Sequence, residues 1–211
     1  MSSTVLVSAE VREHLMSSDP VMKSIVQRVG DLSFNVDPDL WRSLVGSIVG
    51  QQLSVAAART IRGRVAALSP DGFPDPRLIL DLPDETLRGC GLSRGKLAYL
   101  RDLAHRWELG EIEPELLSQL PDEEVIERLS RVKGIGRWTA EMVLIFSMNR
   151  PDVLAVDDLG IRSAVQKAYK LPERPGKEEL LRIGEGWKPF RTYASLYLWD
   201  SLKKENLEPG S

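Results

Sequence analysis

The chain has 211 residues, of which 42% are hydrophobic and 28% are charged, and its formal net charge is −3. This composition is typical of a globular protein with one large domain or two small ones. The single cysteine, Cys90, excludes an internal disulfide and a cysteine-built zinc or iron–sulfur site.

No apolar run reaches the length of about 18 residues that a membrane span needs. The N-terminus has no charged start followed by a long apolar core, so we expect no signal peptide. We therefore expect a cytoplasmic (nucleoid) protein in a bacterium, or a nuclear one in a eukaryote.

The net charge alone argues weakly against nucleic acid as a partner, because binding phosphates needs clustered Lys and Arg. Basic residues nevertheless gather in short segments, which predict either a basic face or ordinary solvated helix faces. These residues are Arg59, Arg62, Arg64, Arg94, Lys96, Arg131, Lys133 and Arg137.

Helical periodicity begins after residue 36. Asp37 and Pro38 are typical of a helix start, and one apolar stripe follows. It consists of Leu40, Trp41, Leu44, Val45, Ile48 and Val49. A second helix is expected from Ser54 as its cap, with an apolar side formed by Val55, Ile61, Val65 and Leu68.

Further along the chain, residues 93–110 predict a helix that opens at Ser93 and closes at Gly110. Its inward positions are Leu97, Leu100, Ala104 and Trp107. In total the sequence predicts roughly ten short helices. Residues 5–11 are compatible with an extended segment, but no strand pair is expected, so the fold class is all-α.

The sequence VKGIG, residues 132–136, lies between two helical segments. We expect glycines on both sides of Ile135 to allow backbone geometry that a side chain would forbid. Gly136 precedes a helix N-terminus, where free N–H groups can receive a phosphate oxygen, and Lys133 and Arg137 flank it. A plain helix–turn–helix joint is the alternative.

Four segments carry a resemblance to a known family: SIVGQQLSVAAA, VKGIGRWTAE, AVDDLGIR and WKPFRTYASLYLW. Together, and in this order, they resemble the helix-hairpin-helix DNA glycosylases, which are base-excision repair enzymes. The resemblance runs from about Trp41 to Trp199 and is closest to the alkylpurine branch, the 3-methyladenine DNA glycosylases.

The resemblance implies two helical subdomains with the active site in a cleft between them. We expect a wedge loop in about residues 36–110, and the hairpin with a catalytic aspartate in about residues 111–170. Residues 1–35 and 171–211 are expected to pack together as terminal segments of the same compact unit. The chain lacks the four cysteines of the iron–sulfur members.

In this family an essential carboxylate precedes two residues and an apolar helix position, a pattern that selects Asp158. A fixed anion stabilises the oxocarbenium-like sugar that forms as an N-glycosidic bond breaks, and it can orient or deprotonate the attacking water. Asp157 is then expected as a helix cap. A cap is also the alternative role for Asp158, and the two roles are compatible.

Members of the family that also cut the strand have a lysine two residues after the last glycine of the hairpin. Here that position is Trp138, which cannot form a Schiff base. We therefore predict a monofunctional enzyme of the DNA-3-methyladenine glycosylase II type, which uses water and leaves an abasic site. The alternative role for Trp138, a core aromatic, excludes the lyase reaction equally.

A flipped nucleotide leaves a gap that a wedge must fill. The resemblance assigns the plug to Gln52, with Gln51 and Ser54 nearby, and a buried polar turn is the alternative. For the flipped base it implies an aromatic cradle. Its residues are expected to be Trp199, Trp138 and Met142, where relatives have a tyrosine, and Tyr197, for which the core is the alternative role.

DNA contacts at the hairpin are expected from Lys133, Gly134, Gly136 and Arg137. The resemblance also implies a monovalent cation, Na⁺ or K⁺, on the backbone carbonyls of Ser130, Val132 and Ile135, and no required cofactor. The expected partner is duplex DNA with damaged purines, bound by a monomer. Two other functions remain open: a non-catalytic helix-hairpin-helix DNA-binding protein, and a glycosylase for oxidised or mismatched bases.

Overall fold

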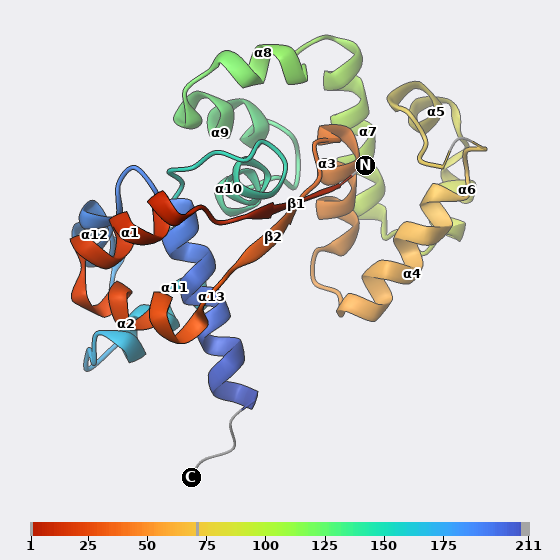
Figure 1. Ribbon diagram of the computed structural model, residues 1–211. Helices are drawn as coiled ribbons and strands as arrows, with labels where there is room; N and C mark the ends of the chain where they lie inside the picture. Colours follow the sequence, from red (N-terminus) through yellow and green to blue (C-terminus); the bar gives the residue numbers. More distant parts are fainter. Residues whose placement is uncertain (1, 71, 208–211) are drawn as a thin grey trace. The chain divides into compact units, whose positions relative to one another are not determined.

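The computed structural model of the protein describes residues 2–70 and 72–207. Within these residues it contains thirteen α-helices, one 3-10 helix and one two-stranded sheet (Figure 1). The all-α fold class is therefore confirmed. No helix in this described part is long and apolar enough to cross a membrane.

The chain divides into two compact units. The first unit comprises Met1–Val36 and Leu144–Ser211, and the second comprises Asp37–Val143. The division falls inside one helix, α10 (Arg137–Phe146). Consequently Asp158 belongs to the first unit, whereas the hairpin and the wedge loop belong to the second. The subdomain limits expected from the sequence stay a prediction.

In the first unit, the C-terminal helix α13 contacts α2 and α11, whereas α1 contacts α2 and η1, and α12 contacts η1. The elements, in chain order, are β1 (Ser3–Leu6), α1 (Ala9–Ser18), α2 (Pro20–Val29), β2 (Ser33–Val36), α11 (Leu159–Ala168), α12 (Lys177–Gly184), the 3-10 helix η1 (Glu185–Trp187) and α13 (Arg191–Leu207).

The strand pair corrects our expectation that no strands would pair. β1 runs antiparallel to β2, with Ser3 opposite Val36 and Leu6 opposite Ser33 (Figure 1). Phe34 and Val36 alternate inward and pack with Leu196 of α13. Each strand has only four residues, too few for the alternation of a strand to stand out in the sequence.

Asp19 joins three helix ends in the first unit. Its Oδ1 caps α2 by accepting from the backbone N–H of Val21 and Met22. Its Oδ2 accepts from the Tyr169 hydroxyl and from the Trp187 indole N–H. Burial, with the nearby Asp19 carboxylate, raises the pKa of Tyr169 well above its usual range.

In the second unit, α7 contacts α3, α5 and α6, and α3 also contacts α4. Before α10, the elements of this unit are α3 (Leu40–Gly50), α4 (Val55–Ala66), α5 (Pro76–Asp81), α6 (Asp84–Gly89), α7 (Arg94–Glu108), α8 (Pro114–Gln119) and α9 (Asp122–Ser130). All six residues of the apolar stripe predicted for α3 are buried.

Two details of these helices differ from the sequence prediction. The cap of α3 is Asp39, because its carboxylate accepts from the backbone N–H of Arg42, and Asp37 only hydrogen-bonds the N–H of Asp39. Val55 is 88% exposed and was wrongly expected on the buried side of α4, whereas Val65 of the same predicted side is fully buried. Ser54 and Ser93 cap α4 and α7 as predicted.

Candidate functional site

Asp158 lies half-buried at the N-terminus of α11 and caps that helix. Its Oδ1 accepts from the backbone N–H of Ile161 at 2.8 Å and from the indole Nε1–H of Trp199 at 2.9 Å. The prediction that Asp157 caps this helix is therefore wrong. Asp158 itself is the cap, and Asp157 is exposed beside it. Two donors from different helices fix the orientation of this carboxylate.

Gly160 leaves the room that the Trp199 indole needs. A Cβ at this position would lie 3.0 Å from Asp158 Oδ1, 3.0 Å from Trp199 Cδ1 and 3.1 Å from Trp199 Nε1. Trp199 also stacks on Phe146, with ring centroids 6.0 Å apart and planes inclined by 25°. The indole is thus held between an aromatic ring and the carboxylate.

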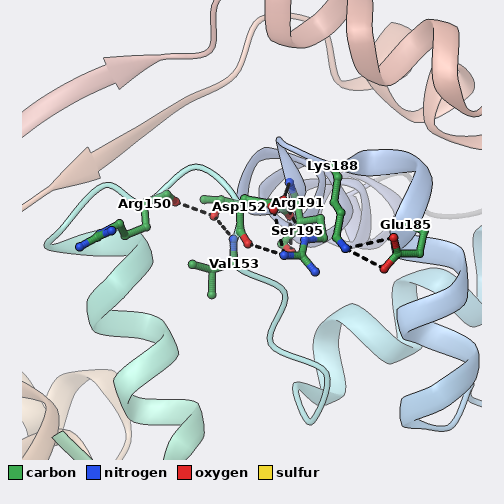
Figure 2. A network of polar contacts seen from close by, with 8 residues as sticks. Arg150, Asp152, Val153, Glu185, Lys188, Arg191 and Ser195 are labelled. Carbon is green, nitrogen blue, oxygen red and sulfur yellow. Dashed lines mark hydrogen bonds and ion pairs between the residues drawn. The ribbon is translucent and has the colours of Figure 1, made fainter. Parts of the chain in front are cut away.

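The segment that leads to Asp158 is tied to α13 by a polar network that the sequence did not reveal (Figure 2). Arg191 forms a two-pronged ion pair with Asp152, with Nε–Oδ1 at 2.7 Å and Nη2–Oδ2 at 2.9 Å. The hydroxyl of Thr192 donates to the carbonyl of Arg150 and accepts from the N–H of Val153. The start of α13, the helix that carries Trp199, is therefore attached to the loop before Asp158.

Tyr197 does not lie where a base can reach it. Its side chain has no exposed surface, and its hydroxyl donates to the carbonyl of Gly30 at 3.2 Å. These contacts support the alternative role in the core. The sequence signal for this alternative was the surrounding run of apolar residues in YASLYLW.

In the second unit, the loop of residues 51–54, for which we predict the wedge role, joins α3 to α4. Gln52 is exposed and has a φ of 55°, a left-handed conformation that non-glycine residues seldom adopt. This exposure excludes the buried polar turn for Gln52. Ser54 caps α4 through its hydroxyl, and Gln51 Nε2–H donates to the carbonyl of Gly134 at 2.6 Å.

A surface groove of about 440 Å³ lies beside the wedge loop. Leu53 and Val55 contribute exposed apolar side chains to it, and Arg59 and Arg62 contribute positive charge. Because it is both apolar and basic, this groove is compatible with contact to bases and phosphates.

The hairpin, residues 132–136, turns tightly around Ile135, which is 3% exposed and donates its N–H to the carbonyl of Val132 at 3.0 Å. Gly134 has a φ of 82°, and a Cβ there would lie 2.2 Å from the Tyr99 ring. Gly136 has open space around it and no positive φ. Of the two hairpin glycines, therefore, only Gly134 has no room for a side chain.

The two basic residues of the hairpin have different surroundings. The Lys133 side chain is 70% exposed, and its Nζ lies 3.8 Å from Asp102 Oδ1. Arg137 pairs with Glu123 and with Glu141, whose side chain is only 2% exposed. The hydrogen bond to Glu123 raises the pKa of Arg137. Two carboxylates already balance the Arg137 charge, so Lys133 is the better placed phosphate ligand.

Trp138 and Met142 lie four residues apart on α10 and share one side of the helix. Trp138 is 48% exposed, which excludes its role as a core aromatic, and Met142 is half-buried.

The described residues contain no group of three or more His, Cys, Asp or Glu able to hold a metal ion.

Comparisons with known proteins identify the family to which the chain is similar. Residues 45–189 match the sequence model of the family described as HhH-GPD superfamily base excision DNA repair protein. The chain is 40% identical over 205 residues to DNA-3-methyladenine glycosylase 1 of Schizosaccharomyces pombe, which covers 95% of this chain and 89% of that protein.

Two solved structures are similar as well. One is the 3-methyladenine DNA glycosylase of the same yeast in complex with abasic DNA, with a TM-score of 0.83, 39% identity, and 92% of this chain and 97% of that chain covered. The other is a DNA-3-methyladenine glycosidase from Bacillus halodurans, with a TM-score of 0.89, 34% identity, and 98% and 95% covered.

Proposed function

Because this chain belongs to the HhH-GPD superfamily of base excision DNA repair proteins, we propose that it is a monofunctional DNA glycosylase. It hydrolyses the N-glycosidic bond of alkylated purines, such as 3-methyladenine, in duplex DNA and leaves an abasic site. Relatives named as 3-methyladenine DNA glycosylases, similar over nearly the whole chain, support this substrate class. The observation on which the proposal depends is the oriented carboxylate of Asp158.

Asp158 is the catalytic residue of the proposed reaction. As the purine departs, positive charge develops on the sugar, and a fixed anion stabilises that charge without having to reorganise. The hydrogen bonds from Ile161 and Trp199 to Oδ1 hold the carboxylate in one orientation. The same group orients or deprotonates the water that attacks the sugar. An alkylated purine that is already cationic leaves readily, so little acid catalysis on the base is needed.

The absence of a strand-cutting step follows from the residue at position 138. A lyase needs an amine there to attack the sugar and form a Schiff base. The indole of Trp138 supplies no such amine, and its exposed face is suited to stacking on a base instead. We assign base contacts to Trp138, Met142 and Trp199, and leave the buried Tyr197 out of the site.

DNA is held by the second unit in this proposal. Gln52, exposed at the tip of the wedge loop, fills the gap left by the flipped nucleotide. Lys133 and the N–H groups around Gly134 and Gly136 bind a phosphate next to the N-terminus of α10. In this proposal the protein binds DNA as a monomer. It acts in the nucleoid if the organism is a bacterium and in the nucleus if it is a eukaryote.

The proposed reaction uses water and calls for no organic cofactor. A monovalent cation is the one additional group we propose, held by the carbonyls of Ser130, Val132 and Ile135. Ser130 is the last residue of α9, where helix carbonyls lack intrahelical partners, and Val132 accepts only one hydrogen bond within the hairpin from Ile135. Such a cation would strengthen the phosphate site by its charge.

The test is base release by Asp158→Asn. Duplexes containing 3-methyladenine, 7-methylguanine, 1,N6-ethenoadenine, hypoxanthine or 8-oxoguanine are incubated with each protein, and released base and strand cleavage are scored separately. We expect the wild-type protein to release alkylated purines without cutting the strand. Removing the charge from Asp158 should slow release about a hundredfold to a thousandfold, the range of a lost electrostatic stabiliser.

Asp157→Asn is the matched control, since it removes the same charge from the exposed neighbouring residue. We expect it to keep nearly full activity. Unchanged release by Asp158→Asn would overturn the catalytic assignment. A wild-type protein that binds abasic DNA tightly and releases no base from any duplex would instead indicate the non-catalytic DNA-binding protein.

A further inference from the structure

Helix α7 contacts the C-terminal end of α3 through one lysine. The Nζ of Lys96 donates to the carbonyl of Val49 at 2.8 Å and to the carbonyl of Gln51 at 2.7 Å. Helix ends leave such carbonyls without intrahelical partners, so the ammonium group fixes the backbone where the wedge loop begins. Burial at this position lowers the pKa of Lys96.

Farther along α7, Tyr99 and Asp102 contact the hairpin, and each lies three residues after the preceding contact residue of this helix. The Tyr99 ring fills the space above Gly134. Asp102 Oδ2 accepts from the backbone N–H of Lys133 at 2.9 Å. Burial alone would raise the pKa of Asp102, but the hydrogen bonds from Lys133 and Arg106 and their charges lower it overall.

Gln51 connects the two loops directly, through the hydrogen bond from its Nε2–H to the carbonyl of Gly134. The carbonyl of Gln51, held by Lys96, belongs to the peptide that leads into Gln52. Gln52 adopts its left-handed conformation immediately after that fixed peptide plane. The contacts of Lys96 therefore hold the peptide that immediately precedes Gln52.

We propose that Lys96, Tyr99 and Asp102 are positioning residues that hold the wedge loop, residues 51–54, and the hairpin, residues 132–136, in a fixed arrangement. Gln52 and Lys133 then meet DNA as one preformed surface, so little ordering is needed when the complex forms. This inference rests on the proposed DNA binding and adds residues that need not touch DNA themselves.

A double-mutant cycle tests the proposal. Binding of a duplex with a tetrahydrofuran abasic analogue is measured by fluorescence anisotropy for the wild-type protein, Lys96→Met, Gln52→Ala and the double variant. We expect Lys96→Met to weaken binding about tenfold, the size expected for losing hydrogen bonds from a charged donor. In the Gln52→Ala background the same change should have little further effect, because Lys96 acts through Gln52.

Lys23→Met is the matched control, because it removes one positive charge from an exposed position of α2. It should bind within about twofold of the wild-type protein, since distant exposed charges are largely screened. Lys96→Arg, which keeps charged donors near the two carbonyls, should restore much of the affinity. Circular dichroism confirms that each variant is folded.

Equal weakening by Lys96→Met in both backgrounds would overturn the proposal, because it would show a general folding or charge effect. If Lys96→Met does not fold, Gln51→Leu takes its place in the same cycle, since it removes only the link to Gly134. Base release by the wild-type protein is scored separately. Additive binding effects with intact release would refute the positioning role alone, and wild-type protein that does not bind the duplex would refute both proposals.

Discussion

At Asp158, one carboxylate oxygen accepts from a backbone N–H three residues along the chain and from an indole forty-one residues along it. The first bond is the ordinary cap of a helix. The second exists only because Gly160 has no side chain, so that the edge of Trp199 can approach the carboxylate. Position 160 therefore controls whether the carboxylate has its second donor.

Gly160→Ala separates activity from stability. In a helix, alanine is favoured over glycine by about 1 kcal/mol. The added methyl group would, however, crowd Asp158 and Trp199, and such overpacking costs about 1–3 kcal/mol. We expect the free energy of unfolding, measured with urea, to fall by about 1 kcal/mol. Single-turnover base release should slow about tenfold or more, because the indole is pushed from Asp158.

Gly63→Ala is the control for the propensity effect. Gly63 lies within α4 and has nothing within 4 Å of an added Cβ, so alanine there should stabilise the protein by about 0.5–1 kcal/mol with no change in release. If Gly160→Ala released base at the wild-type rate, the indole contact would not be required to orient Asp158.

At the scale of elements, the hairpin is a turn whose geometry is set from outside it. Tyr99 of α7 occupies the space beside Gly134, and Asp102 of the same helix accepts from the N–H of Lys133. Ile135 anchors the turn in the core. A substitution at Gly134 must therefore disturb both the backbone of the turn and its packing against α7.

Gly134→Ala should destabilise the protein by about 2–4 kcal/mol, because a left-handed alanine costs about 1–2 kcal/mol and the contact with Tyr99 adds an overpacking penalty. Affinity for abasic-analogue duplex should fall as well. Gly136→Ala is the matched comparison two residues away, with open space and no positive φ, and it should change stability by less than about 1 kcal/mol. Urea unfolding and anisotropy measure both effects, and equal losses for the two variants would contradict this account.

The elements that the sequence predicted well are those specified by local patterns. The stripe of α3 and the caps Ser54 and Ser93 needed only spacing and residue type. The pairing of β1 with β2 was missed because its hydrophobic signal is a single pair, Phe34 and Val36, packed against α13. Likewise, Val55 looked apolar enough to be buried, but no element covers it.

The site divides in the same way. The family resemblance selected Asp158 and the hairpin, because those motifs are contiguous in sequence. The bond from Trp199 to Asp158, the bond from Gln51 to Gly134 and the pairing of Arg191 with Asp152 join residues far apart in the chain. A single sequence contains no signal for such long-range contacts. These contacts are nevertheless the ones that orient the functional groups.

At the scale of the whole molecule, a chain of net charge −3 binds a polyanion in our proposal. Many of its guanidinium groups are paired with carboxylates, as Arg101 is with Asp84, Arg106 with Asp102 and Arg191 with Asp152. A guanidinium group that already pairs with a carboxylate is less available to a phosphate. We therefore expect DNA binding to depend on few phosphate contacts, made by side chains as exposed as that of Lys133.

Lys133→Ala and Arg137→Ala separate these two uses of positive charge. Removing Lys133, which is 70% exposed, should lower the slope of log K against log salt by about 1 and change stability by less than about 0.5 kcal/mol. Removing Arg137 takes one charged hydrogen bond from Glu141, whose side chain is 2% exposed, which should destabilise the protein by about 2 kcal/mol and leave the salt slope nearly unchanged. Anisotropy titrations at several salt concentrations and urea unfolding provide both measurements. A salt slope that falls for Arg137→Ala and not for Lys133→Ala would assign the phosphate contact to Arg137, despite its two carboxylate partners.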